Sequence, residues 1–233
     1  MDADAAEREP AADSPRAPRT GSERTRRHFS MIREFHLADL FTIMNGFLGA
    51  GALLAYMRFL LDRRAEFFWL GTALLPVALV MDVLDGRIAR RRGVASPFGQ
   101  ELDSLADAVS FGVAPAAMAF AAGLRGGWDA AFLVYFVGCG ISRLARYNVT
   151  AESLSDPAAQ RGRAKVTHFE GLPIPSSLLL VVLFAILAGT GRWQEALPGG
   201  AIALGPWVLH PLALLYFVHG SAMISKTLHI PKP

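Results

Sequence analysis

Residues 81–107 read MDVLDGRIARRRGVASPFGQELDSLAD and place four aspartates between long apolar stretches. Asp82 and Asp85 are three residues apart, and Asp103 and Asp107 are four apart, so each pair shares one face of a helix. An ionised aspartate inside a bilayer costs about 2.5–3.5 kcal/mol on insertion scales. Such a cluster therefore needs a compensating cation, and facing carboxylates are the oxygen ligands that Mg²⁺, Mn²⁺ and Ca²⁺ prefer.

The remaining sequence is typical of a polytopic membrane protein. Hydrophobic residues make up 52% of the 233 residues, and the mean hydropathy of +0.33 is high for a soluble domain. A helix that crosses a bilayer needs about 20 residues. We therefore predict an all-α membrane protein with six transmembrane helices, at approximately residues 40–61, 66–90, 100–124, 128–148, 171–191 and 199–223.

The two ends of the chain complete the predicted organisation. Residues 1–27 are rich in Ala, Pro, Arg and Glu and lack the apolar core of a secretory signal, so we predict a disordered tail without a cleaved signal peptide. Phe29, Ile32 and Phe35 recur every three residues, which predicts a short N-terminal interfacial helix or an extension of the first membrane helix. The predicted parts are a cytoplasmic tail (1–27), a membrane domain (28–225) and a short cytoplasmic C-terminus (226–233).

The basic residues predict the orientation in the membrane. If the N-terminus is cytoplasmic, 18 of the 23 Lys and Arg residues lie on the cytoplasmic side. We therefore expect both termini and the aspartate stretch at the cytoplasmic face of the cell membrane. Because the positive charges flank apolar stretches, the net charge of +3 fits an anionic membrane surface and not a nucleic-acid partner. The single cysteine, Cys139, excludes an internal disulfide and a multi-cysteine metal site.

The chemistry suited to the aspartate cluster is displacement at a diphosphate. Bound metal ions would bridge carboxylates and phosphate oxygens, and one carboxylate would take the proton of an attacking hydroxyl. Gly86 and Gly99 are small and would let the two helices approach closely around the loop 91–98. One alternative is an ion-coupled transporter, which should spread its carboxylates along the bilayer depth and show paired repeats; this sequence shows neither. A second alternative is a set of ion pairs between the aspartates and Arg87, Arg90, Arg91 and Arg92.

The same stretch resembles a known family. It matches D-x-x-D-G-x-x-A-R-x(8)-G-x-x-x-D-x-x-x-D, the signature of the CDP-alcohol phosphotransferases, without departure. The resemblance implies a CDP-linked donor, an alcohol acceptor, CMP as by-product, and Mg²⁺ or Mn²⁺ as cofactor, with Ca²⁺ also open. It further implies a homodimer in the lipid bilayer. The implied roles are metal ligands for Asp82, Asp85, Asp103 and Asp107, catalytic base for Asp107, and nucleotide contact for Gly86, Ala89, Arg90 and Gly99.

Three further segments resemble the phosphatidylserine synthase branch of that family. They are LADLFTIMNGFLGAG (37–51), ELDSLADAVSFGVAPA (101–116), and SRLARYNV (142–149) followed by FEGLPIPSS (169–177). This resemblance implies transfer of a phosphatidyl group from CDP-diacylglycerol to L-serine, giving phosphatidylserine and CMP. The alternative within the family is another acceptor, such as glycerol 3-phosphate, an inositol phosphate or another alcohol.

Polar residues near the cytoplasmic helix ends are candidates for substrate contact. Arg143 and Arg146 are three residues apart and could bind the acceptor's carboxylate as a fork. Asn148 could hydrogen-bond the acceptor's amine or carboxylate, and Lys165 could close the site from the linker 149–170. The alternatives are membrane anchoring for the two arginines and a solvated surface position for Lys165.

A polar stripe marks the start of the first predicted helix. Asp39, Thr42 and Asn45 are spaced three apart and are predicted to line the cytidine-binding site. The alternative is helix capping by Asp39 and interhelical hydrogen bonding by the other two. His210 and His219 lie far from the motif and have no Cys or Asp beside them in sequence, so no metal role is expected for them.

Overall fold

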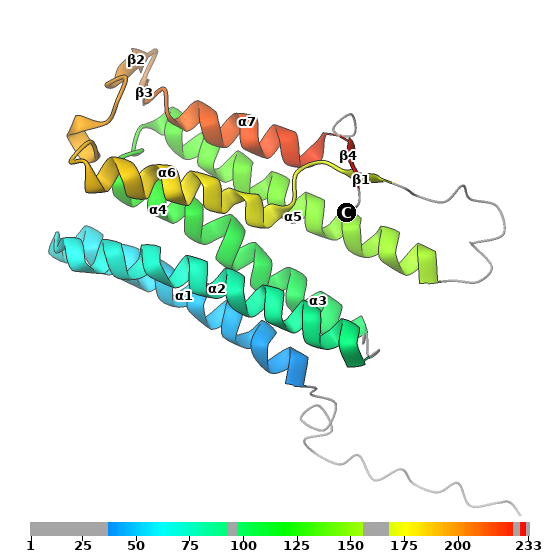
Figure 1. Cartoon of the computed structure of the whole chain (residues 1–233). Coiled ribbons are helices and arrows are strands. Elements are labelled where there is room, and N and C mark those ends of the chain that lie inside the picture. The colour runs from blue at the N-terminus through cyan, green and yellow to red at the C-terminus, as the bar shows by residue number, and fades with distance from the viewer. Residues whose placement is uncertain (1–36, 93–96, 156–167, 226–228, 232–233) are drawn as a thin grey trace, which may run out of the picture. The chain divides into compact units, whose positions relative to one another are not determined.

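The computed structural model describes residues 37–92, 97–155, 168–225 and 229–231. The predicted tail and nearly all of the predicted interfacial helix lie outside these residues. Among them the structure is mostly helical (Figure 1). The long elements are α1 (Leu37–Asp62), α2 (Ala65–Arg92), α3 (Pro97–Asp107), the π-helical segment η2 (Ala108–Val113), α4 (Ala114–Ala122), α5 (Gly127–Ser155), α6 (Leu178–Gly189) and α7 (Ala213–Ile224). The short elements are the 3-10 turns η4 (Ile174–Ser177) and η5 (Gln194–Ala196) and the strands β1 (His168–Glu170), β2 (Ile202–Leu204), β3 (Trp207–Leu209) and β4 (His229–Pro231).

Four helices are long and apolar enough to cross a membrane. They cover Asp39–Asp62, Ala65–Ile88, Phe98–Ala122 and Gly127–Thr150, which are the first four predicted stretches. The third of these is one continuous helix built from α3, η2 and α4. Two shorter apolar helices follow, Ile174–Gly189 and Ala213–Ile224. The fold is thus that of an integral membrane protein with at least these four candidate spans in the described part of the chain.

The sixth predicted helix is wrong in its first half. Instead of a helix from residue 199, an antiparallel hairpin pairs β2 with β3, and the helix begins only at Ala213. Gly199, Gly200 and Gly205 have positive φ angles of 88°, 62° and 65°. Glycine adopts such angles without steric cost, and they interrupt a right-handed helix. The stretch from residue 199 is apolar enough for a membrane helix, but its glycines do not allow a continuous helix.

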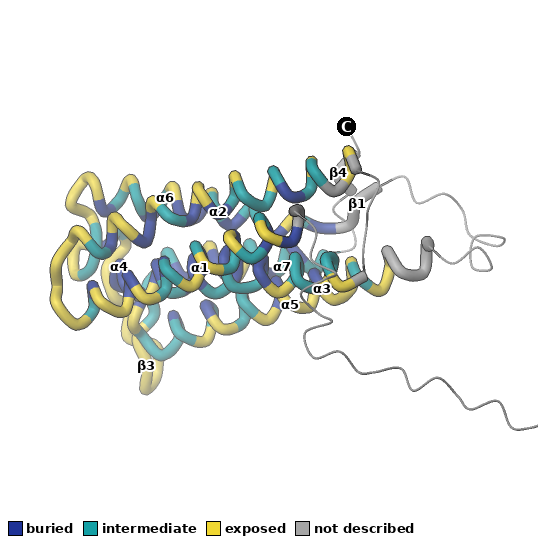
Figure 2. Tube along the Cα trace, turned by 90° about the horizontal axis from the view of Figure 1, so that it is seen from below, coloured by how far each residue is buried: buried dark blue, intermediate teal, exposed yellow. Residues whose placement is uncertain are grey.

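The helices pack through aromatic and small residues and leave an apolar outer surface. Tyr56, Phe59 and Phe68 are almost fully buried between α1 and α2. Phe47, with 66% of its surface exposed, and Val134, with 72%, point outward although they are apolar. Figure 2 shows exposed positions following the outer sides of the helices, with buried positions between them. An exposed apolar surface of this extent is the kind that contacts lipid.

Two glycines let α1 lie directly against the helix that carries Asp103 and Asp107. A Cβ atom on Gly46 would lie 3.6 Å from Ala106 Cβ, and one on Gly49 would lie 2.8 Å from Ser110 Cα. The second distance is too short for any side chain. Ser110 belongs to η2, where the Ala114 N–H donates to the Val109 carbonyl five residues back. Such π segments recur at functional sites, and this one begins directly after Asp107.

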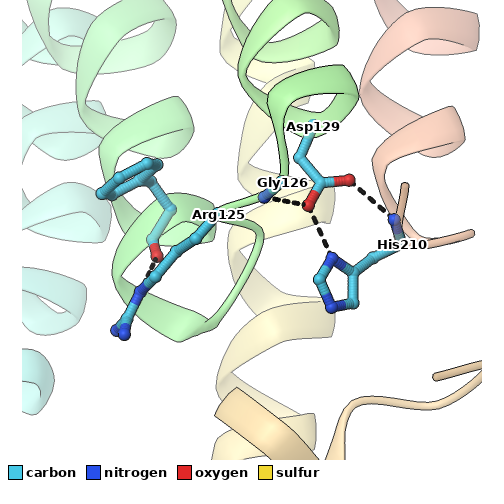
Figure 3. Close-up of polar contacts among 5 residues, drawn as sticks. Arg125, Gly126, Asp129 and His210 are labelled. Atoms are coloured by element: carbon cyan, nitrogen blue, oxygen red, sulfur yellow. Dashed lines mark hydrogen bonds and ion pairs between the residues drawn. The ribbon is translucent and has the colours of Figure 1, made fainter. Parts of the chain in front are cut away.

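A buried carboxylate, Asp129, anchors the hairpin to the first turn of α5 (Figure 3). Its Oδ2 atom accepts the Gly126 N–H at 2.7 Å, and its Oδ1 atom accepts the His210 N–H at 2.7 Å. His210 Nδ1 lies 2.6 Å from Oδ2 of the same carboxylate. His210 therefore does have an aspartate partner, which sequence proximity did not reveal.

Burial, and then the charge of Arg63, lower the pKa of the neighbouring Arg125, which donates to two carbonyls at the end of α4.

Candidate active site

Three of the motif aspartates converge as the sequence predicts. Carboxylate oxygens of Asp82 and Asp85 in α2 and of Asp103 in α3 all lie within 4.8 Å of one another. The two helices reach this arrangement because both pack against α1, which is their common neighbour. Three carboxylates at this spacing can act together as ligands of a hard cation.

Asp107 completes the group one helical turn beyond Asp103. It is buried, with 7% of its surface exposed, and its Oδ1 accepts the Asn45 Nδ2 hydrogen at 3.1 Å. The Asp82 carboxyl group lies within hydrogen-bonding reach of it. The four motif aspartates therefore face one region between α1, α2 and α3.

The polar stripe of α1 bonds directly to these carboxylates. Thr42 Oγ1 donates to Asp85 Oδ2 at 2.8 Å, while Asn45 holds Asp107. The interhelical hydrogen bonds expected as the alternative reading of this stripe are thus present. Asp39 is buried at the start of α1, with 4% of its surface exposed. Nucleotide contact by the three residues stays a prediction.

The residues present fit a divalent cation. Asp103 Oδ1 is buried and has no hydrogen-bond partner among the described residues. In the described part of the chain, no ion pair joins a motif aspartate to Arg87, Arg90 or Arg91. The surface ion network considered from the sequence therefore does not form with these arginines. No described arginine forms an ion pair with these carboxylates, so the cluster is expected to bind a metal ion, because unpaired buried charge is costly.

The two glycines of the motif lie in α2 and α3, on either side of the connection between these helices. Arg90 is exposed, and its guanidinium Nη1 lies 3.6 Å from the position that a Cβ atom on Gly86 would take. Gly99 is half-buried near the start of α3. Ala89 lies in α2, but its side chain is outside the described part of the structure. Lys165 is also outside it.

The three acceptor candidates of α5 have different partners. Arg143 is half-buried, its charge interacts with that of Asp107, and its Nε has no hydrogen-bond partner among the described residues. Arg146 is exposed, and its Nη1 donates to the Ile224 carbonyl at the end of α7, at 3.5 Å. Asn148 Oδ1 accepts the Ser104 hydroxyl at 3.1 Å, and its Nδ2 donates back to Ser104 Oγ at 2.9 Å. Of these three, Arg143 is the one that combines proximity to Asp107 with a donor that has no partner in the described part of the chain.

Sequence reasoning missed two residues that support the site. Ser104 lies between Asp103 and Asp107 in the chain and ties α3 to α5 through Asn148. Ser110 Oγ donates to the Asn45 carbonyl at 2.9 Å and ties η2 to α1. Ser104 lies three residues before Asp107 and Ser110 three residues after it. This helical spacing was an available signal that both hydroxyls lie near the site.

The chain is similar to known proteins over most of its length. The family described as CDP-alcohol phosphatidyltransferase matches residues 35–213. A relative from Saccharomyces cerevisiae is 44% identical over 207 residues, which are 88% of this chain and 74% of the relative. One from Mycobacterium leprae is 39% identical over 61% of this chain and 46% of its own length. One from Methanocaldococcus jannaschii is 37% identical over 49% of this chain and 50% of its own length. All three are named CDP-diacylglycerol–serine O-phosphatidyltransferase, and this chain spans half or less of the last two.

Proposed function

The chain belongs to the CDP-alcohol phosphatidyltransferase family, and from that premise we propose that it transfers a phosphatidyl group from CDP-diacylglycerol to L-serine. The products are phosphatidylserine and CMP. The observation that carries the proposal is the convergence of Asp82, Asp85 and Asp103 beside a buried Asp107. Serine as the acceptor is supported by the names of the three relatives.

We assign the metal-binding role to the three converging aspartates, with Asp107 able to share an ion. An all-oxygen ligand set suits Mg²⁺ or Mn²⁺, and Ca²⁺ is also compatible with it. Ions bound there would offset the charge of the diphosphate and stabilise the departing phosphate. Asp103 Oδ1 is directly available for this role, because no described group bonds to it.

Asp107 acts as the general base in this proposal. Its carboxylate takes the proton of the serine hydroxyl while the hydroxyl oxygen attacks the phosphorus of the phosphatidyl group. The bond from that phosphorus to CMP breaks, and the electron pair leaves with CMP. Asn45 fixes one oxygen of the base by its hydrogen bond to Oδ1. A single in-line displacement of this kind needs no nucleophilic Ser or Cys in the protein.

Arg143 is the residue we assign to the acceptor's carboxylate. Its guanidinium is half-buried near Asp107, and its Nε is free to donate. Guanidinium groups bind carboxylates strongly because the hydrogen bonds are charge-assisted. Arg146 and Asn148 already have partners on α7 and α3, so we assign no acceptor contact to either.

The donor's nucleotide would lie at the motif glycines. Gly86 leaves space beside Asp85, and the Arg90 guanidinium stands over it. Asp39 and Gly99 complete the residues that we assign to this part of the site, with Ala89 from the family motif. Arg90 would offer a cation to a phosphate that lies against Gly86, where no side chain is in the way.

We further propose six membrane crossings, with the aspartates at the cytoplasmic face of the cell membrane and a homodimer as the working unit. The apolar helices Ile174–Gly189 and Ala213–Ile224 would extend about 24 and 18 Å at 1.5 Å per residue. Both fall short of a bilayer core of about 30 Å, so flanking apolar residues must complete these crossings. Tryptophan prefers membrane interfaces. Trp69 lies near the start of α2, Trp128 near the start of α5, Trp193 after α6, and Trp207 in β3.

An acceptor panel tests the function. Purified protein with Mn²⁺ or Mg²⁺ and CDP-diacylglycerol is given serine, glycerol 3-phosphate or inositol phosphate, and CMP release is measured. We expect release with serine. Release only with another acceptor would reassign the chain within its family, and no release with any acceptor from folded protein would overturn the activity. An ion-coupled transporter would release no CMP under any of these conditions.

A further inference from the structure

The side chain of Asn45 is only half satisfied. The residue is fully buried, at 0% exposure, on the face of α1 that meets α3. Its Nδ2 donates to Asp107 Oδ1 at 3.1 Å, and its backbone carbonyl accepts the Ser110 hydroxyl at 2.9 Å. Its Oδ1 atom is buried, and no donor among the described residues reaches it.

The orientation of this amide follows from the chemistry of its partner. An ionised carboxylate only accepts hydrogen bonds, so the amide nitrogen must face Asp107 and the amide oxygen must face elsewhere. Ser110 holds the backbone of Asn45 in place. A buried amide oxygen without a donor is costly, and the donor is therefore expected from a bound molecule.

A second unpaired group lies near the same carboxylate. Arg143 comes from α5, its charge interacts with Asp107, and its Nε is buried without a partner among the described residues. Two polar atoms near Asp107 thus have no partner among the described residues: the acceptor Asn45 Oδ1 from α1 and the donor Arg143 Nε from α5. An amino acid with a hydroxyl group complements this set, because it brings an ammonium donor, a carboxylate acceptor and a proton for the base.

We propose that Asn45 Oδ1 accepts a hydrogen bond from the ammonium group of the acceptor, which makes Asn45 a specificity-determining residue. The proposal rests on the transfer to serine proposed above and deepens it. The acceptor is then held at three points: ammonium at Asn45, carboxylate at Arg143 and hydroxyl at Asp107. Asn45 serves the reaction twice, since its other end orients the base.

Asn148 provides a matched control within the same chain. It is also an asparagine near the motif, but Ser104 bonds both ends of its amide, and Gln100 approaches its Oδ1 at 3.5 Å. Its loss should loosen the contact between α3 and α5 without removing a partner of the ammonium group. The two asparagines therefore separate acceptor recognition from helix packing.

The experiment compares serine with 3-hydroxypropionate, which lacks the ammonium group, in full-length protein with Mn²⁺ and CDP-diacylglycerol. A site built to hydrogen-bond a substrate group rejects analogues without it, so wild type should prefer serine by about 100-fold or more in kcat/KM. Asn45→Ala should reduce this preference at least about 10-fold, mainly through a higher KM for serine, and should change the KM for CDP-diacylglycerol by less than about threefold. Asn148→Ala should keep the wild-type preference.

A second variant keeps the test valid if Asn45→Ala does not fold. Asn45→Asp keeps an oxygen acceptor of the same shape but removes the donor to Asp107, so kcat should fall while the preference for serine persists. Loss of the preference in Asn45→Asp, or an unchanged preference in Asn45→Ala, would overturn the proposal. A larger effect of Asn45→Ala on the KM for CDP-diacylglycerol than on that for serine would also overturn it, in favour of a nucleotide contact. Wild type that uses another acceptor but not serine would remove the underlying function as well.

Discussion

Asp129 and the motif aspartates form two separate carboxylate sites, one near each end of α5. They differ in how many of their oxygens accept hydrogen bonds from the protein. Asp129 is in the first turn, while Arg143 and Asn148 near the other end face Asp107 and Ser104. Asp129 and Asn148 are about 28 Å apart at 1.5 Å per residue. Both oxygens of Asp129 accept hydrogen bonds from the protein. In contrast, Asp103 Oδ1 has no partner among the described residues.

The difference separates a structural carboxylate from a reactive group. Asp129 accepts the N–H of Gly126, the residue before the helix, in the manner of a capping box, and favours the helix N-terminus by its charge. Asp129 is also fully buried, so a ligand cannot reach its carboxylate. At the other site, three buried atoms have no hydrogen-bond partner among the described residues, namely Asp103 Oδ1, Asn45 Oδ1 and Arg143 Nε. Folded proteins rarely leave such atoms unpaired unless something binds there.

Replacing the reactive carboxylate should have the largest effect. We expect Asp107→Asn to lower kcat by about 100- to 10,000-fold, the range typical of a lost general base, while CDP-diacylglycerol still binds. The measurements are CMP release and donor binding by calorimetry. Asp129→Asn is the matched control and should keep kcat per folded molecule within about threefold, because distant sites act independently. Turnover of Asp107→Asn near the wild-type rate would exclude it as the base.

Removing the structural carboxylate should mainly affect stability. Asp129→Ala leaves the N–H groups of Gly126 and His210 and the His210 ring without their acceptor. A fully buried donor without an acceptor costs about 1–3 kcal/mol; these three are half-buried, so we expect a net loss of about 2–4 kcal/mol in the free energy of unfolding. Thermal unfolding in detergent measures it. A Tm equal to that of wild type would mean that the hairpin does not depend on this contact.

Divalent metal should stabilise the folded protein by binding at the motif aspartates and not at Asp129. Mn²⁺ at 100 times its Kd should add about 2.7 kcal/mol to the free energy of unfolding, which raises Tm by about 5–10 °C for a chain of this size. Asp103→Asn should abolish most of this shift, whereas Asp129→Asn should retain it. An equal Tm shift in both variants would place the ion elsewhere. Chelation should abolish CMP release, and added Mn²⁺ should restore it.

The smallest expected effect concerns the contact between α1 and the helix that carries Asp107. Gly49→Ala places a Cβ atom 2.8 Å from Ser110 Cα, and overpacking of this kind costs about 1–3 kcal/mol. Gly138→Ala is the control, because a Cβ atom there meets nothing within 4 Å and should stabilise α5 by about 0.5–1 kcal/mol. Tm and kcat are measured for both variants. If Gly49→Ala leaves both values unchanged, the close approach does not position Asp107.

Much of the fold could be predicted because apolar length is a local property. The helices predicted at 40–61 and 128–148 became α1 and α5 with longer ends. The hairpin Ile202–Leu209 was missed because its residues are as apolar as those of a membrane helix. The glycines at 199, 200 and 205 were the available signal, since they favour turns within a run otherwise free of charge.

The sequence by itself determined that each pair of motif aspartates shares one face of a helix and that the chain has the character of a membrane protein. These follow from residue type at short spacing, which the geometry of one helix converts into a common face. Only the tertiary structure decided which polar groups have partners, because those partners are distant in sequence. Thr42 and Asp85 are 43 positions apart, Asn45 and Asp107 are 62 apart, and Asp129 and His210 are 81 apart. Within the described part of the chain, helix packing therefore satisfied Asp129 and Asn148 and left Asn45 Oδ1 and Arg143 Nε without a partner near Asp107.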